Sequence, residues 1–183
     1  MHVNRPLVAV AAVAAGMLAA SAVVLSTAAS GDGGSRVIRA QLSGYHENPL
    51  ALSSDGVGHF RARINPSAGT ITYRLSYDSL EGSVTQAHIH FGSPSQVGGV
   101  AAFLCTNLGN GPVGTQACPA SPGVITGTIR AADVIGPAAQ GIAAGQFTEL
   151  LAAIRADTTY VNVHSDLYPV GEIRSQLEHA GHH

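Results

Sequence analysis

Two runs of alternating apolar and polar residues, 57–64 and 70–75, constrain the fold of this chain more than any other feature. Side chains two apart in a strand share a face, so each run predicts a strand with one buried and one exposed face. The segment between them, 65–69, reads Asn-Pro-Ser-Ala-Gly, which is a turn sequence. The two runs therefore predict a β-hairpin, and the other segments have to be placed around an antiparallel sheet.

Further strands are predicted wherever apolar residues alternate between turn residues. These segments are 36–42, 86–91, 97–104, 124–129, 158–164 and 171–177. The stretch 147–155 is different, because its apolar residues recur three and four positions apart, which predicts a short helix. We expect an all-β fold, either an antiparallel β-sandwich or a flattened Greek-key barrel of about eight strands, with this one helix.

The first thirty residues predict export. An uncharged apolar stretch, 6–25, follows Arg5 and ends in small residues, which is the pattern of a secretory signal peptide. The expected organisation is a signal peptide (1–29), a linker (30–36), one folded domain (37–178) and a histidine-rich tail (179–183). The alternative is that the apolar stretch stays in place as a membrane anchor. Under either interpretation we expect a secreted or cell-envelope protein.

The cysteines and the charged residues limit the compartment and the partners that this chain can have. Cys105 and Cys118 fall in the exported part, where an oxidising compartment favours a disulfide, and closing this loop contributes about 3 kcal/mol in the chain-entropy model. The chain has 9 basic and 11 acidic residues. The basic residues form no run, so we expect no nucleic-acid partner. We expect a monomer whose partner lies outside the cell or in its envelope, with membrane contact only through an uncleaved N-terminal segment.

Three histidines on predicted strands form the candidate site. His88 and His90 lie two apart and so share a face, and His164 lies on a later strand. If these strands are close, three imidazoles suit Cu(II), or zinc with an open position. The alternative is that the histidines only satisfy hydrogen bonds, on a solvent-facing sheet face or between loops.

Three more residues are candidates for supporting these histidines. Asn162 shares a strand face with His164, where it either orients that ring or is an exposed strand residue with no special role. Glu172 and Arg174 share a face of the last predicted strand, either as further supports or as a cross-strand ion pair that holds the strand in register. The sequence contains no nucleophile elbow, phosphate-binding glycine loop or paired carboxylates, so no catalytic residue is predicted.

Several segments, in order, resemble the CHRD (chordin) domain family. They are Leu42-Ser43-Gly44 with Glu47 and Pro49, Gly56 with Gly58, Ala87-His88-Ile89-His90, Tyr160-Val161-Asn162-Val163-His164-Ser165 and Pro169-Val170-Gly171-Glu172-Ile173-Arg174. The resemblance covers nearly all of residues 37–177. It implies export and a β-sandwich, and it implies no reaction. The expected function is therefore a non-enzymatic extracellular binding or structural module.

A second resemblance is to Cu/Zn superoxide dismutase, which also carries an H-x-H pair on one strand and a further copper-ligand histidine on a late strand. His88 and His90 match the pair, and His164 matches the later ligand. The chain has no counterpart of that family's long zinc loop. This resemblance implies an alternative function, a copper-binding protein or copper-dependent oxidoreductase with copper at the three histidines.

Overall fold

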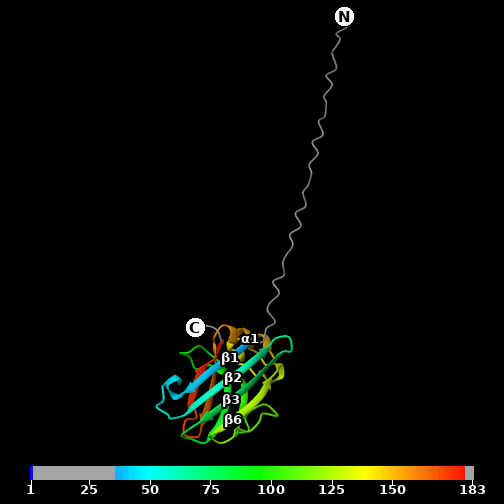
Figure 1. Ribbon diagram of the computed structural model, residues 1–183. Helices are drawn as coiled ribbons and strands as arrows, with labels where there is room; N and C mark the ends of the chain where they lie inside the picture. The colour runs from blue at the N-terminus through cyan, green and yellow to red at the C-terminus, as the bar shows by residue number, and fades with distance from the viewer. Residues whose placement is uncertain (2–35, 180–183) are drawn as a thin grey trace. The chain divides into compact units, whose positions relative to one another are not determined.

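The computed structural model describes residues 36–179, together with Met1 (Figure 1). The predicted signal peptide, and almost all of the predicted linker and tail, lie outside the described residues. The strands are β1 (Arg36–Ser43), β2 (Val57–Asn65), β3 (Thr70–Asp78), β4 (Val84–Phe91), β5 (Gly99–Thr106), β6 (Gly123–Ile129), β7 (Thr159–Ser165), β8 (Ile173–Gln176) and β9 (Glu178–His179). The helices are α1 (Phe147–Arg155) and the short 3₁₀ turns η1 (Gly44–His46), η2 (Ala131–Asp133) and η3 (Ala138–Gln140).

None of the helices in the described part of the chain has the length and apolarity needed to cross a membrane.

The strands form one antiparallel sheet that curls into a nearly closed barrel (Figure 1). Across the sheet the order is β5-β4-β7-β8-β1-β2-β3-β6, and the short β9 pairs with β1. The predicted hairpin is formed by β2 and β3, with Asn65 opposite Thr70 next to the turn. The all-β prediction is confirmed, and of the two architectures left open the sheet adopts the barrel.

The seam of the barrel lies between β5 and β6, the two ends of the sheet order. Gln116 Nε2 bridges it by donating to the carbonyl oxygens of Leu104 on β5, at 3.0 Å, and Thr126 on β6, at 3.2 Å. The predicted disulfide is present, and it joins Cys105 on β5 to Cys118 in the loop, with Cα atoms 5.0 Å apart. A side chain and a tethered loop therefore close the seam.

The alternating strands turn their apolar residues into the barrel. Buried and exposed residues alternate along the whole of β2. Helix α1 has the predicted bounds and lies at one end of the barrel, where its apolar face joins the core (Figure 1). Each fully buried Leu, Ile or Phe contributes about 1.5–3 kcal/mol, so this shared core fixes both the sheet and the helix.

Strands β4 and β7 depart from this alternation because both of their faces are covered. All seven residues of β7 are buried, and so are residues 87–90 of β4. One face of the two strands belongs to the apolar core, through residues such as Ala87, Ile89 and Val161. The opposite face, which we call the polar face, carries His88, His90, Tyr160, Asn162, His164 and, from the neighbouring β8, Arg174. Its side chains are buried under loops.

Candidate metal site

The structure brings the three predicted histidines together on the polar face. Strands β4 and β7 are neighbours, and their register places His88 opposite Asn162 and Gln86 opposite His164. On this face the pair Gln86–His164 lies on one side of the pair His88–Asn162, and the pair that contains His90 lies on the other side. His164 and His90 are therefore both neighbours of His88. The condition on which the metal hypothesis depends, that the two strands are close, is met.

The three rings meet closely enough to share an ion. Each offers one ring nitrogen, and these nitrogens all lie within 4.8 Å of one another. His88 Nδ1 is 3.3 Å from His164 Nε2. Nitrogens bound to one ion at about 2.0–2.1 Å lie at most about 4.2 Å apart, so ring movements of under about 1 Å suffice to bring all three into coordination.

Backbone carbonyls fix the orientation of two rings. His90 Nδ1 lies 2.9 Å from the carbonyl oxygen of Gly98, and His164 Nδ1 lies 3.1 Å from that of Pro169. A carbonyl only accepts hydrogen bonds, so both Nδ1 atoms carry the proton and each Nε2 keeps its lone pair. Such a carbonyl contact behind a histidine is the usual support for a metal ligand.

Two ring nitrogens have no partner. His88 Nε2 and His90 Nε2 are buried and make no hydrogen bond within the described residues. A buried polar atom left unpaired costs about 1–3 kcal/mol. An ion between the rings would relieve part of this cost, so the residues present fit a bound transition metal.

Burial also determines the charge of the cluster. It lowers the pKa of His88 to about 2, with further lowering by the neighbouring His164 and His90. Burial likewise lowers the pKa of His90 to about 4, against the opposing effect of its bond to Gly98, and that of His164 to about 4. The rings are therefore neutral near pH 7, which is the form that binds metals.

Aromatic and cationic groups hold the rings in place. Tyr160 stacks on His90 with ring centroids 4.7 Å apart and planes 4° from parallel. The Arg174 guanidinium carbon lies 3.5 Å from the Tyr160 ring centroid on that ring's face, a cation–π contact. Phe103 from β5 meets His88 edge-on at 4.3 Å. The cluster is thus packed between an arginine-tyrosine stack and a phenylalanine.

The residues predicted to support the histidines mainly hold loops. Glu172 is fully buried and accepts hydrogen bonds from Ser54 Oγ at 2.9 Å and the Glu81 amide at 2.6 Å. Arg174 donates to the carbonyls of residues 93, 94 and 96, it stacks on the Tyr160 ring that covers His90, and its charge adds to the lowering of the His90 pKa by burial. Within the described residues no ion pair joins Glu172 to Arg174, because each has other partners.

Glu47 is the residue near the site that sequence reasoning missed. Its buried carboxylate accepts a hydrogen bond from Asn162 Nδ2 at 2.7 Å, so Asn162 faces Glu47 and leaves its own Oδ1 unpaired. Burial raises the pKa of Glu47 to about 7, although Arg174 opposes the shift. The only sequence signal for Glu47 is its place in the CHRD-like motif, because a loop residue has no face that periodicity can assign.

The contact between Asn162 and Glu47 requires a glycine at position 171. A Cβ at this position would lie 2.6 Å from Asn162 Nδ2 and 2.7 Å from Glu47 Oε2, and its φ of +149° disfavours any other residue. The loop that carries Pro169 therefore approaches the polar face at a glycine, and its carbonyl can then reach His164.

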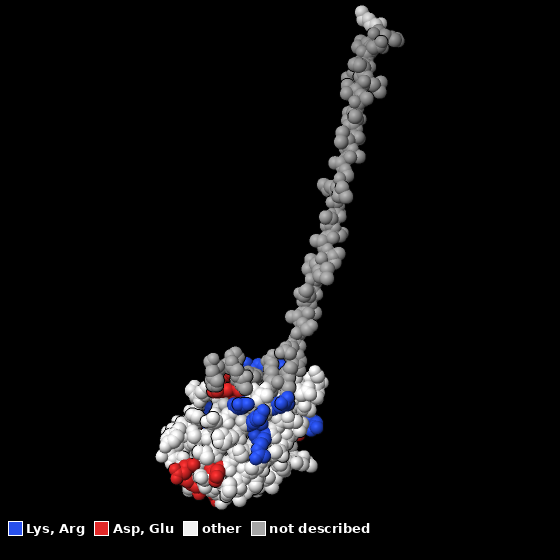
Figure 2. Space-filling model, viewed as in Figure 1, with Lys and Arg blue, Asp and Glu red and all other residues white. Residues whose placement is uncertain are grey.

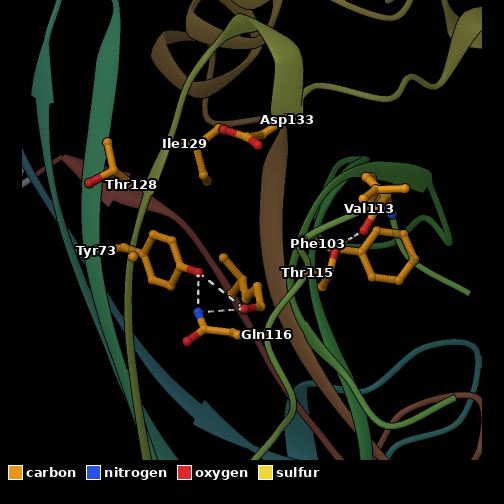
Figure 3. A pocket seen from close by; sticks show the side chains of 12 residues that line it. Tyr73, Phe103, Val113, Thr115, Gln116, Thr128, Ile129 and Asp133 are labelled. Carbon is orange, nitrogen blue, oxygen red and sulfur yellow. Dashed lines mark hydrogen bonds between the residues drawn. The ribbon is translucent and has the colours of Figure 1, made fainter. Parts of the chain in front are cut away.

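Two pockets flank the cluster. One, of about 320 Å³, lies at the barrel seam, where the Tyr73 hydroxyl and the Gln116 amide meet at one side and Phe103 stands at another (Figure 3). Phe103 also contacts His88, so its ring separates this pocket from the cluster. The other, of about 260 Å³, is mostly apolar and is lined by residues of the 47–52 and 167–171 loops that cover the polar face.

The fold and the site define a class of protein, a nearly closed antiparallel β-barrel with three buried histidines on the outside of two adjacent strands. The family model for the CHRD domain matches residues 38–177. The chain therefore belongs to the CHRD domain family, as its sequence segments predicted. Comparisons with curated proteins and with solved structures gave no match.

Proposed function

We propose that this CHRD domain is an extracytoplasmic, non-enzymatic binding module whose cluster of His88, His90 and His164 holds one copper ion. The convergence of three buried imidazoles carries the metal part of the proposal. The family match supports the module, and a disulfide is consistent with an oxidising compartment. Copper is the choice because imidazole ligands suit it and it heads the affinity order of the divalent first-row metals, with zinc as the competing ion.

The enclosure of the cluster favours a held ion over a reacting one. His88, His90 and His164 are 2%, 8% and 6% exposed. A copper ion bound here would supply a redox or Lewis-acid centre, but a substrate needs an open path to it. The loops that carry Gly98 and Pro169 are hydrogen-bonded to the ligand rings themselves, so they act as fixed covers.

Metal content tests the proposal. Purified exported protein is titrated with Cu(II) and, separately, with Zn(II), and bound metal is measured after gel filtration. We expect one tightly bound copper per chain, lost in His88→Gln/His90→Gln and retained in the matched control His46→Gln/His59→Gln. Both control residues are exposed, and the histidine-rich tail is present in every variant.

Two results would contradict the proposal. Equal copper binding by both double variants would assign the metal to the tail or the surface. Turnover of superoxide or an oxidisable phenol by the copper-loaded protein, abolished in His88→Gln/His90→Gln, would replace the non-enzymatic module by the oxidoreductase alternative.

A further inference from the structure

The outer face of β1, β2 and β3 collects arginines that are scattered in the sequence. All nine basic residues of the chain are arginines. Arg39 lies opposite Arg61, and Arg61 lies opposite Arg74, so the three form a straight row across the strands. Arg63 lies two residues along β2 from Arg61 on the same face, and all four are exposed. We call these four residues the arginine row.

Figure 2 shows basic side chains gathered across this face, while acidic side chains collect toward its lower end. Neighbouring strands are about 4.7–4.9 Å apart, so the line of Arg39, Arg61 and Arg74 within the arginine row is about 10 Å long. One carboxylate flanks it, because Glu178 of β9 lies opposite Arg39. Four guanidinium groups and one carboxylate leave a strongly positive strip on a chain whose net charge is −2.

This arrangement costs stability by itself. Like charges directly opposite each other on adjacent strands are destabilising. Within the described residues, Arg174 is the arginine whose guanidinium donates hydrogen bonds, and no hydrogen bond to another residue of this part of the chain occupies the guanidinium groups of the four exposed ones. A guanidinium matches a carboxylate, sulfate or phosphate with two parallel hydrogen bonds. A local rule broken without internal compensation is expected at a functional site.

We propose that the arginine row binds a linear acidic polysaccharide. A straight row of charges at regular strand spacing suits a chain that carries an acidic group on successive sugars. Single-stranded nucleic acid is disfavoured because its binding relies on aromatic stacking, and Tyr45, the aromatic among the exposed large apolar residues of the described chain, belongs to η1 and not to this face.

A membrane surface is a poorer fit. Peripheral membrane binding combines basic residues with apolar side chains that insert into the lipid. Most residues that surround the row on this face are polar, such as Gln41, His59, Thr72 and Thr126, and the apolar neighbour Val37, opposite Arg63, is half-buried. The exported location expected from the sequence places the domain where polysaccharides are found. This inference concerns a surface separate from the histidine cluster and does not depend on the metal.

The test uses polygalacturonate as the probe, with neutral dextran, a 20-nucleotide DNA strand and vesicles containing phosphatidylglycerol as comparisons. Binding to immobilised polygalacturonate is measured at 50 mM and 200 mM NaCl. We expect wild-type binding that weakens with salt, because released counterions drive it. Arg61→Gln/Arg74→Gln should weaken binding at least tenfold, and Arg130→Gln/Arg155→Gln should change it less than twofold.

The two double variants change the net charge equally, and all four residues are exposed. Equal losses in both would show that only net charge matters and would overturn the site. No binding of polygalacturonate by the wild type, or stronger binding of the DNA or the vesicles, would overturn the polysaccharide assignment. Arg61→Gln/Arg74→Gln should unfold at the same or a higher temperature than the wild type at low salt, which separates lost binding from misfolding.

Discussion

At the scale of single residues, the most informative side chains are buried polar ones. The three histidines, Glu47 and Asn162 are packed against one another or against loop carbonyls, and three of their polar atoms have no partner in the described chain. One alternative predicted for the histidines, an exposed sheet face, is wrong, because loops bury them. The remaining alternative is a purely structural role between loops, and metal analysis decides between it and an ion site.

Strand parity allowed the sequence to predict which residues share the polar face. The two-residue spacing of His88 and His90, and of Asn162 and His164, placed each pair on one side of its strand. Parity gives no information about loops, so the partner of Asn162 had to come from the structure. Glu47 lies 115 positions away from Asn162, and no local pattern links the two.

Glu47→Gln is expected to remove a pH effect on stability. The folded-state pKa of Glu47 is about 7 and its ordinary value is 4.5. The folded state therefore binds the proton more tightly than the unfolded state does. This contribution to the free energy of unfolding is fully present below pH 4.5 and is lost as the pH rises through 7. The uncharged glutamine avoids the loss, so at pH 8 the variant should be more stable by about 2–3 kcal/mol.

Denaturant unfolding at pH 4.5, 6 and 8 measures this effect. The difference between the two proteins isolates Glu47, because the histidines titrate in both. A difference in stability that stays constant from pH 4.5 to 8 would contradict the pKa shift.

At the scale of elements, loops are held by side chains that lie on strands or directly beside them. Arg174 of β8 donates hydrogen bonds to carbonyls of the 93–96 segment, and Glu172 accepts hydrogen bonds from the amides of residues 81 and 82. The His164 ring donates a hydrogen bond to the carbonyl of Pro169. The sequence motif near the C-terminus therefore encodes loop attachment as much as a strand. Sequence reasoning singled out Glu172 and Arg174 either as supports for the histidines or as a cross-strand ion pair, and it missed their loop contacts because it could not say which loops pass over the face.

Arg174→Lys should loosen the 92–98 loop while the barrel stays folded. A lysine keeps the charge but loses the forked geometry and the stack on Tyr160. Loss of charged hydrogen bonds of this kind costs about 1.5–3 kcal/mol. Faster amide hydrogen exchange confined to residues 92–98 would verify the role. Arg155→Lys on α1, where the side chain is exposed, is the matched control and should exchange as the wild type does.

The disulfide at the seam between β5 and β6 should stabilise the domain. Replacement of Cys105 and Cys118 by serine should lower the free energy of unfolding by about 3 kcal/mol, because the loop they close is no longer constrained in the unfolded state. Equilibrium unfolding of the double variant measures the loss, and reduced wild-type protein should match it. Unchanged stability would mean that the Gln116 bridge closes the seam without help.

At the scale of the whole molecule, the sequence predicted a sandwich or a barrel but could not decide between the two. The continuity of the barrel's sheet depends on Ser43 of β1 pairing with Arg174 of β8, strands from opposite ends of the domain. Alternating runs predict which segments are strands and which face is buried, but a sandwich and a barrel share both properties. The arginine row shows the same limit, because residues 39, 61 and 74 form no run and become neighbours only through the register.

Metal binding should stabilise the entire barrel. An ion that binds only the folded state adds about 2.7 kcal/mol at a free concentration one hundred times its dissociation constant. Copper should therefore raise the melting temperature of the wild type and leave that of His164→Gln unchanged. A rise of equal size in both proteins would contradict binding at the cluster.

The pairing of β1 with β9 has a consequence for how this domain can be used in larger proteins. Ile38 lies opposite His179, so the first and last strands of the described domain run side by side and antiparallel. A chain can enter and leave the domain at nearly one point. Insertion of the domain into a surface loop of another protein would therefore separate the two ends of that loop very little, and short linkers would be enough to string copies in tandem.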